Sequence, residues 1–335
     1  MSDILKKKVF FHFGFPKTGS KFLQELFFPK HSQVNYITKQ NNYLSTEPNK
    51  NPRYNFFMFP RFEKSIWKMT DNEFNNKYNE LLEKFNFFYS TLDSNKCNIL
   101  SNENILQQFF YKDAEYDFAK GFSRLVTLFN HSNIDLNIFL VIRNQSEIIP
   151  SFFYQANIYK ALKEFSINAD EIIKFFKTKK NINTEVSKKI FDNFKYNNLY
   201  NFFSSQVKKD KIKFFLYEDL QYNKEKFFSE LSNYLEIEIL NSDELFKDKI
   251  HMTKKKLRYN TLSYLIYKNL KQPLKLVYKF IPKLNTLIKF LIKGGKNSEY
   301  NKIRQNSRLI KNYYRDDCLQ LKEKLNLNLD NSKYF

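Results

Sequence analysis

The sequence predicts an α/β fold in which a central, mostly parallel sheet is flanked by helices, with a helical, basic region at the C-terminal end. Short, continuously apolar segments rich in β-branched and aromatic residues recur along the chain, which is typical of parallel strands buried on both faces. Longer segments with helical periodicity lie between them, and strands that alternate with helices favour a parallel sheet. The chain of 335 residues is long enough to bury a sizeable core.

The predicted elements follow this alternation along the chain. Apolar segments predict strands at residues 9–13, 98–100, 137–142 and 212–217. Periodic segments predict helices at residues 19–28, 72–88, 115–129 and 224–235. The Asn-rich stretch 35–55, with Pro48 and Pro52, predicts a long loop of the kind that forms lids or substrate loops. We expect one α/β domain over residues 1–250 and a basic helical region over 251–335 that packs on the same domain.

Composition excludes several classes of protein. Hydrophobic residues make up 42% of the chain and aromatic residues 18%, which excludes intrinsic disorder. The two cysteines, Cys97 and Cys318, are too few for a disulfide framework and lack the spacing of a usual zinc site. The first residues have no apolar segment of signal-peptide length, and no run of about 18 apolar residues occurs. We therefore expect a soluble, cytoplasmic protein.

The chain is strongly basic. Its 56 Lys and Arg residues exceed its 35 Asp and Glu residues by 21, which predicts anionic partners; a composition typical of AT-rich coding explains such a surplus equally well. The stretch 250–298 resists the second explanation, because it holds twelve Lys or Arg residues and no acidic one. Within it, residues 254–296 suit amphipathic helices at an anionic inner-membrane surface, a groove for an acidic glycan, or an ordinary helical cap with a lysine-rich solvent face.

A phosphate-binding loop follows the first predicted strand. Residues 9–28 read VFFHFGFPKTGSKFLQELFF, so an apolar strand leads into the loop GFPKTGS and then into a helix. The N-terminus of a helix offers unpaired N–H groups to a phosphate, and glycines let the backbone approach it. In nucleotide triphosphatases the loop reads GxxxxGK[ST]. Here Gly14 and Gly19 have that separation, but Ser20-Lys21 follows, and the lysine placed to meet a phosphate is Lys17 inside the loop.

The ordered run PKTGS resembles the 5′-phosphosulfate loop of sulfotransferases that use 3′-phosphoadenosine 5′-phosphosulfate (PAPS) as donor. The resemblance implies a P-loop-type three-layer fold, with Lys17 on the bridging oxygen and the sulfuryl group. It also implies a donor-binding loop around the 5′-phosphate made of Pro16, Lys17, Thr18, Gly19, Ser20 and Lys21. Lys21 departs from the family pattern, in which Thr or Ser is common, and it either adds charge to the site or points outward.

A second motif follows the strand at 137–142. The segment RNQSEIIPSFFYQ begins with Arg143 at the carboxyl end of that strand, where open α/β sheets bind ligands, and Ser151 comes eight residues later. Arginine offers a planar fork of donors to a phosphate, and a serine hydroxyl adds another donor. The segment resembles the 3′-phosphate motif of the same family, although Gln145 replaces the usual proline and Phe153 stands where tyrosine is common. The resemblance implies that Arg143 and Ser151 bind the 3′-phosphate.

A third segment, KFFLYEDLQYNKEKFFSELSNYLEIE at 213–238, resembles the strand ending in YEDL and the helix that follows it in these enzymes. We interpret Glu218 or Asp219 as a capping and bracing residue at the start of that helix. The resemblance spans residues 8–28, 97–106, 134–158 and 211–238, with a weaker match at 310–327 to the last helix of the family.

Sulfuryl transfer needs a base for the acceptor hydroxyl and cations that stabilise the leaving phosphate, but in principle no divalent metal. The segment NILSNENIL at 98–106 resembles the SSEN-type segment of carbohydrate-directed sulfotransferases, which implies that Glu103 is the base. Burial would have to raise its pKa. The alternative for Glu103 is a carboxylate at a helix N-terminus, and His31 is an alternative base. His12, in the first strand, is expected to pack behind the loop.

The sequence thus favours a PAPS-dependent sulfotransferase acting on a hydroxyl, with a carbohydrate as the expected acceptor, by in-line transfer with a carboxylate base. A P-loop nucleotide kinase is the alternative enzyme; the loop order disfavours it, and no strand clearly ends in the aspartate that would hold Mg²⁺. A basic RNA-binding or anionic-surface-binding protein is the non-enzymatic alternative. Because no RNA-binding motif occurs, we expect no nucleic-acid partner.

Overall fold

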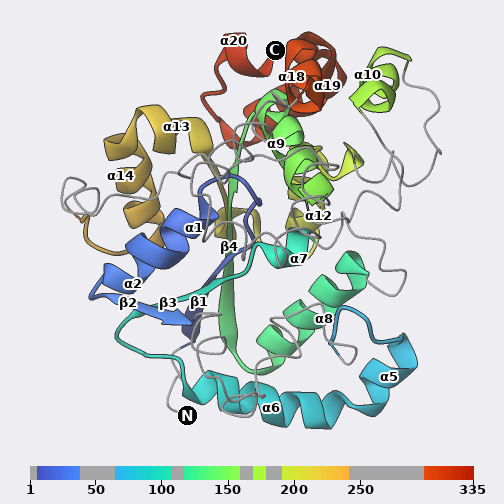
Figure 1. The fold of residues 1–335 in the computed structure, drawn as a ribbon. Helices are drawn as coiled ribbons and strands as arrows, with labels where there is room; N and C mark the ends of the chain where they lie inside the picture. The colour runs from blue at the N-terminus through green and yellow to red at the C-terminus, as the bar shows by residue number, and fades with distance from the viewer. Residues whose placement is uncertain (1–5, 38–64, 108–116, 159–168, 179–190, 241–297) are drawn as a thin grey trace, which may run out of the picture. The chain divides into compact units, whose positions relative to one another are not determined.

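The computed structural model describes residues 6–37, 65–107, 117–158, 169–178, 191–240 and 298–335. Within them, a five-stranded parallel sheet has the order β2-β3-β1-β4-β5. Figure 1 labels β1 to β4 of this sheet. Its strands are β1 (Lys7–His12), β2 (Val34–Ile37), β3 (Cys97–Ser101), β4 (Ile134–Ile142) and β5 (Ile212–Leu216). The predicted fold class is confirmed: a parallel sheet is flanked by helices, and most of the C-terminal residues 298–335 are helical.

The helices fall between the strands and after the last one. Up to β4 they are α1 (Ser20–Phe22), the π-helical turn η1 (Leu23–Phe27), α2 (Phe28–Lys30), α5 (Asp71–Asn76), α6 (Tyr78–Ser90), α7 (Asn104–Gln107) and α8 (Phe118–His131). After β4 they are α9 (Gln145–Ile158), α10 (Ala169–Thr178), α12 (Tyr196–Ser204), the short turn η5 (Lys209–Lys211), α13 (Tyr217–Tyr222), α14 (Lys224–Leu235), α18 (Ser298–Gln305), α19 (Ser307–Leu325) and α20 (Asn331–Tyr334). No helix among the described residues is long and apolar enough to cross a membrane.

The elements differ from the predicted ones at a few places. The expectation of a loop over 35–55 is wrong at its start, because residues 35–37 belong to β2 at the edge of the sheet. The strand expected at 212–217 ends one residue earlier, since Tyr217 begins α13. The helix expected at 72–88 is two helices that meet at Lys77. Residues 38–55 and the basic stretch 254–296 lie outside the described residues.

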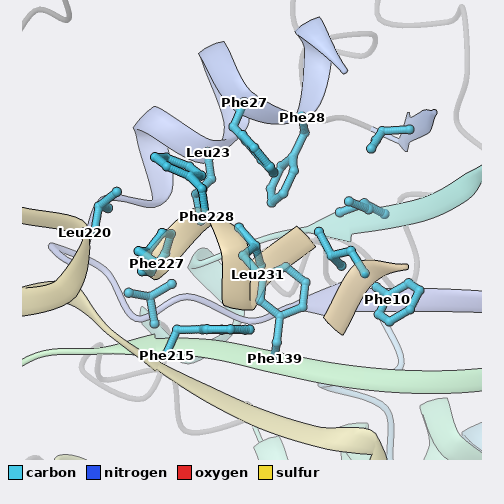
Figure 2. Packing of buried hydrophobic residues seen from close by; sticks show 14 residues of the cluster. Phe10, Leu23, Phe27, Phe28, Phe139, Phe215, Leu220, Phe227, Phe228 and Leu231 are labelled. Atoms are coloured by element: carbon cyan, nitrogen blue, oxygen red, sulfur yellow. The ribbon is translucent and has the colours of Figure 1, made fainter. Parts of the chain in front are cut away.

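Helices α1, η1, α2 and α14 cover one face of the sheet. Alternate strand residues point into this layer, among them Phe10 of β1, Phe139 of β4 and Phe215 of β5, which meet helix residues such as Phe27 and Phe228 (Figure 2). The cluster consists of Phe10, Leu23, Phe27, Phe28, Val34, Ile99, Phe139, Val141, Phe215, Leu220, Phe227, Phe228, Leu231 and Leu235, all buried. Burial of an apolar side chain of this size contributes on the order of 2 kcal/mol, so the layer fixes the helix that follows the loop firmly against the sheet.

Helices α8 and α12 cover the opposite face. Phe11 and Phe13, on either side of the end of β1, stack with ring centroids 4.1 Å apart. Phe13 meets Phe122 of α8 edge to face at 5.8 Å, and Phe122 meets Phe203 of α12 at 4.9 Å. The loop after β1 therefore begins in a part of the sheet that is packed with aromatic side chains on both faces.

The chain divides into two compact units. One contains the sheet with the described residues up to 144, residues 191–240 and residues 314–335. The other contains residues 145–158, 169–178 and 298–313, where Lys302 pairs with Asp170 at 2.5 Å and Arg304 with Glu147 at 3.5 Å. Arg143 and Asn144 therefore close the first unit, and α9 begins the second.

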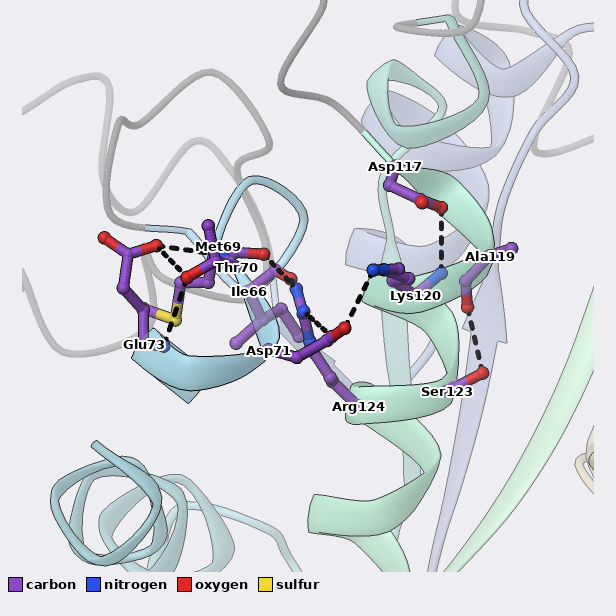
Figure 3. Close-up of polar contacts among 10 residues, drawn as sticks. All are labelled: Ile66, Met69, Thr70, Asp71, Glu73, Asp117, Ala119, Lys120, Ser123 and Arg124. Carbon is purple, nitrogen blue, oxygen red and sulfur yellow. Dashed lines mark hydrogen bonds and ion pairs between the residues drawn. The ribbon is translucent and has the colours of Figure 1, made fainter. Parts of the chain in front are cut away.

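A buried arginine ties the start of α5 to α8. The Arg124 guanidinium donates to the carbonyl oxygens of Ile66 at 2.8 Å and Met69 at 2.7 Å, and to the Asp71 carboxylate at 2.6 Å (Figure 3). The Arg124 side chain is 6% exposed, whereas that of Asp71 is 65% exposed. The exposed Lys120 also pairs with Asp71, at 2.8 Å. Arg124 of α8 thus provides hydrogen-bond donors to two backbone carbonyls of the segment that leads into α5.

The change Arg124→Ala is expected to lower the free energy of unfolding by about 3 kcal/mol or more, because it leaves buried carbonyls without a donor. Urea unfolding measures this loss. Lys120→Ala removes only an exposed partner of the same carboxylate and should change stability little. Equal losses in the two variants would contradict a bracing role for the buried guanidinium.

The C-terminal helix α19 supplies the cap of α12. The backbone N–H of Asn197, in the first turn of α12, donates to the Asp317 carboxylate at 3.1 Å, and Lys195 at the N-cap position makes no side-chain cap of its own. Burial raises the pKa of Asp317 to about 6, against backbone hydrogen bonds from Asn197, Asn198 and Tyr196 that lower it. Burial outweighs these hydrogen bonds, so the folded state favours the protonated carboxyl.

Because the folded-state pKa of Asp317 is raised from 3.8 to about 6, its protonated form stabilises the fold below about pH 4 and this contribution is lost as the pH rises through 6. A shift of this size corresponds to about 3 kcal/mol. We expect the stability of Asp317→Asn relative to wild type to rise by an amount of that order between pH 4.5 and 7.5 in urea titrations. A difference that does not vary with pH would contradict the assignment.

Candidate active site

The loop after β1 runs along the end of β4 before it enters the helix. The Phe13 N–H donates to Phe139 O at 3.3 Å, the Val141 N–H donates to Gly14 O at 2.7 Å, and the Phe15 N–H donates to Val141 O at 3.0 Å. The loop continues the pairing of β1 with β4 beyond His12, so its position at the carboxyl edge of the sheet is fixed by backbone hydrogen bonds.

Two glycines allow the loop its close contacts. Gly14 (φ 111°) and Gly19 (φ 87°) lie in the left-handed region that favours glycine. A Cβ atom at Gly19 would lie 2.7 Å from Leu220 Cδ2, and one at Gly14 would lie 3.0 Å from the Cβ of Glu103. Gly14 therefore lets the loop backbone approach Glu103 directly. Lys17, with φ 72°, is a lysine in the same left-handed region, at a cost of about 1 kcal/mol.

Two hydroxyls close the loop on itself. Thr18 Oγ1 donates to the carbonyl oxygen of Phe15 at 2.6 Å, and Ser20 Oγ donates to the same oxygen at 2.9 Å. Both residues are buried, and so is Pro16, whereas Lys17 and Gly19 are half-buried. These hydrogen bonds stabilise the turn of the loop. The two hydroxyls could donate to a bound phosphate only after their hydrogen bonds to the Phe15 carbonyl oxygen break.

Lys21 points outward. Its side chain is 80% exposed, and its ammonium pairs with the Glu25 carboxylate at 3.5 Å. The two residues are four apart on the helix, a spacing that favours such pairs. The sequence left open whether Lys21 adds charge to the site or points outward, and in the structure it points outward.

Arg143 lies beside the loop. Its Nη1 donates to the carbonyl oxygen of Lys17 at 3.3 Å, and its guanidinium carbon lies 4.7 Å from the ring centre of Tyr217, the first residue of the YEDL segment. The backbone around Arg143 is held as well, because the Tyr196 hydroxyl donates to the Arg143 carbonyl oxygen at 2.7 Å. A cation is therefore fixed at the end of β4, next to the loop that follows β1.

The YEDL segment braces this arginine. Glu218 Oε1 accepts the backbone N–H of Asn144 at 2.9 Å, and Glu218 Oε2 accepts the hydroxyl of the buried Tyr334 at 2.8 Å. Asp219 instead pairs with Lys226 of α14 at 2.9 Å. The expected cap at the start of the helix after β5 is wrong, because α13 has Leu216 at its N-cap position without a side-chain cap and Glu218 reaches across to Asn144 instead. The contribution of Tyr334, from the far end of the chain, left no signal in the sequence.

Ser151 lies in α9 and is half-buried. It belongs to the second compact unit, whereas Lys17, Glu103 and Arg143 belong to the first. The three residues of the first unit lie at the ends of adjacent strands, since β1 pairs with both β3 and β4.

Glu103 follows β3, one residue before α7 begins. Its Oε2 accepts a hydrogen bond from Gln24 Nε2 at 2.5 Å, and the same nitrogen donates to Ser101 Oγ at 2.9 Å. Ser101 Oγ lies 2.7 Å from Nδ1 of His12, which stacks on Phe139 with ring centroids 4.9 Å apart. We name Glu103, Gln24, Ser101 and His12 the Glu103 network. Sequence reasoning missed Gln24 and Ser101.

Tyr36 of β2 lies close enough to the Glu103 network for Glu103 and Ser101 to affect its pKa. Burial raises the pKa of Tyr36, the nearby negative charge of Glu103 raises it further, and a hydrogen bond from Ser101 opposes the rise. Tyr36 is therefore a neutral phenol at physiological pH, next to the carboxylate.

The His31 side chain stabilises the backbone around it. The Gln33 N–H donates to Nδ1 of His31 at 3.2 Å, so Nε2 carries the proton and donates to Glu238 O at 3.0 Å. His31 is 4% exposed. Both ring nitrogens bind backbone groups, which favours Glu103 over His31 as the candidate base.

No family model matches the sequence, and no curated protein matches it. Among solved structures, a sulfotransferase from Alicyclobacillus acidocaldarius aligns with a TM-score of 0.41 and 11% identity, over 80% of this chain and 95% of that chain. The sulfotransferase domain of the olefin synthase from Synechococcus PCC 7002 aligns with a TM-score of 0.33 and 12% identity, over 70% of this chain and 74% of that chain. Both similarities are too distant to assign a function.

Proposed function

We propose that the protein is a sulfotransferase that moves a sulfuryl group from PAPS to an acceptor hydroxyl. The observation that carries the proposal is the contact between Arg143 and the Lys17 carbonyl, together with the approach of Gly14 to Glu103. A donor with a phosphate at each end of its ribose needs two cationic points side by side, and the acceptor needs a base next to the transferred group. Lys17, Arg143 and Glu103 offer these groups at one edge of the sheet.

In this proposal the loop 14–20 binds the 5′-phosphosulfate and Arg143 binds the 3′-phosphate through its fork of donors. Ser151 is proposed as a second donor from the sequence motif alone. The Lys17 ammonium lies at the bridging oxygen. Its charge stabilises the negative charge that develops on the leaving phosphate, and a positioned cation of this kind acts most strongly in a site that excludes water.

The transfer is in line. The acceptor O–H bond breaks as its proton passes to Glu103, a bond forms between the acceptor oxygen and sulfur, and the bond between sulfur and the 5′-phosphate oxygen breaks. The product that leaves is 3′-phosphoadenosine 5′-phosphate (PAP). The group in transfer carries less charge than a γ-phosphate, so the step needs no divalent metal in principle.

We propose a carbohydrate hydroxyl as the acceptor. The proposal rests on the segment NILSNENIL, which resembles that of carbohydrate-directed enzymes, and on a carboxylate in the position of the base. An alcohol hydroxyl is a weak acid, so its attack on sulfur depends on a base that takes the proton during the step.

The experiment is transfer from ³⁵S-labelled PAPS to a panel of oligosaccharides, with phenols and lipid-linked sugars for comparison. We expect label in a saccharide and its loss in Lys17→Ala. Lys21→Ala, whose ammonium points outward, is the matched control and should retain transfer. Transfer of ³²P from γ-labelled ATP in the presence of Mg²⁺, without any ³⁵S transfer, would overturn the proposal in favour of a kinase.

A further inference from the structure

We infer that Gln24 is a positioning residue that holds the Glu103 carboxylate in place as the base for the acceptor hydroxyl. The inference rests on the proposed function, because it assigns Gln24 a part in the same reaction. It is carried by one nitrogen atom, Gln24 Nε2, which lies 2.5 Å from Glu103 Oε2 and 2.9 Å from Ser101 Oγ.

The two hydrogen bonds fix the orientation of the amide. An ionised carboxylate only accepts hydrogen bonds, so with Glu103 in its basic form the atom of Gln24 that faces it is the nitrogen, and the two hydrogens of that nitrogen serve Glu103 and Ser101. Ser101 is the last residue of β3 and is fully buried. The amide therefore links the half-buried carboxylate to a fixed point of the sheet.

Ser101 is itself held by His12. His12 Nδ1 lies 2.7 Å from Ser101 Oγ, and the two residues are partners in the register of β1 with β3. The His12 ring is fully buried and stacks on Phe139. The strand pairing and the His12 contact both hold Ser101, so the position of Gln24 is determined from the sheet side.

The backbone of the helical segment that carries Gln24 is also held in place. Gln24 lies in the π-helical turn η1, in which the Phe28 N–H donates to Leu23 O, five residues earlier. π-helical turns occur frequently at functional sites. Leu23 and Phe27, in the same turn, are fully buried in the core cluster (Figure 2). The turn thus presents the amide to Glu103 from a backbone that cannot shift without disturbing the core.

A hydrogen bond donated to a carboxylate stabilises its ionised form, so the amide opposes the increase in pKa that burial of a carboxyl favours and keeps the base ionised. Within the part of the chain that the structure describes, the charged and titratable groups on the elements around Glu103 include Tyr36 of β2, His12 of β1, Glu25 of η1, Lys17 of the loop and Lys21 of α1. They remain in every Gln24 variant. A difference between variants therefore reports the contribution of the amide.

The test uses Gln24→Met, which keeps the length of the side chain without a donor, and Gln24→Glu, which places a like charge beside Glu103. In protein with carbon-13 in its glutamate carboxyl groups, the Glu103 signal is assigned by its absence in Glu103→Gln. We expect its titration midpoint to rise by about one pH unit in Gln24→Met and further in Gln24→Glu. The acid limb of the pH–rate profile should move by the same amount, with a fall of about tenfold in kcat and an unchanged KM for PAPS.

Gln33→Met is the matched control, because Gln33 lies in the same compact unit and its side chain accepts the Glu238 N–H, at 2.7 Å, instead of donating to a carboxylate. It should leave the midpoint unchanged. The same midpoint in wild type and Gln24→Met would overturn the inference, whatever the reaction is and whatever the added charge does in Gln24→Glu. Absence of PAP binding in wild type would instead overturn the proposed function. The two failures are distinguishable because the Glu103 carboxyl is titrated without PAPS or PAP.

Discussion

Replacement of Glu103 by glutamine is expected to lower turnover about 10²-fold or more and to leave the affinity for PAP unchanged. Glutamine keeps the size of the side chain beside Gly14 but cannot take the proton of the acceptor hydroxyl. The measurement pairs ³⁵S transfer under saturating donor with calorimetric titration of PAP. A loss confined to turnover would identify a residue that acts on the acceptor.

Glu25→Gln is the matched control, because Glu25 is an exposed carboxylate on the same helical segment as Gln24 and pairs only with Lys21 among the ion pairs of the described residues. It should retain wild-type turnover. Turnover of Glu103→Gln close to that of wild type, with PAP bound normally, would remove Glu103 from the mechanism. The carboxylate would then be a helix N-terminal residue before α7.

Replacement of Arg143 by alanine is expected to weaken PAP binding by about 10- to 100-fold, because hydrogen bonds to a charged group contribute roughly 1.5–3 kcal/mol. The guanidinium is fixed between the Lys17 carbonyl and the Tyr217 ring, so little conformational freedom is lost when it meets a phosphate. The affinity for adenosine 5′-phosphosulfate, which lacks the 3′-phosphate, should change much less. Calorimetry with both ligands measures the difference.

Arg308→Ala, at an exposed arginine of α19, is the control for a general loss of positive charge. It should bind both ligands as wild type does. An equal loss for the two ligands in Arg143→Ala would contradict direct recognition of the 3′-phosphate. It would show instead that Arg143 supports the loop through its hydrogen bond to Lys17 O.

The fold was predictable because its central strands are continuous apolar runs. Residues of β1 and β4 are buried from both faces, and this leaves a plain pattern in the sequence. The edge strand β2 reads Val-Asn-Tyr-Ile and is largely half-buried, so neither its length nor its composition distinguishes it from a loop. Strands at an edge carry the weakest pattern because only part of their surface meets the core.

The positions of the loop and of Arg143 at neighbouring strand ends were predictable because each lies within a short ordered motif that follows an apolar strand. The contact of Glu218 with Asn144 was not, because the motif suggested a helix cap. Gln24 was not, because its role depends on a π-helical turn and on partners at Ser101 and Glu103, more than seventy residues away in the chain. Tyr334 meets Glu218 across 116 residues, a contact that no local pattern encodes. The outward direction of Lys21 did have a signal, the glutamate four residues later.

Titration calorimetry with PAP, compared with ADP plus Mg²⁺, tests the central claim most directly. A loop with Lys17 at its centre and Arg143 beside it should bind PAP without a metal, with a dissociation constant of micromolar order or tighter, and should bind ADP more weakly with or without Mg²⁺. Preference for ADP in the presence of Mg²⁺ would contradict the account and indicate a nucleotide kinase.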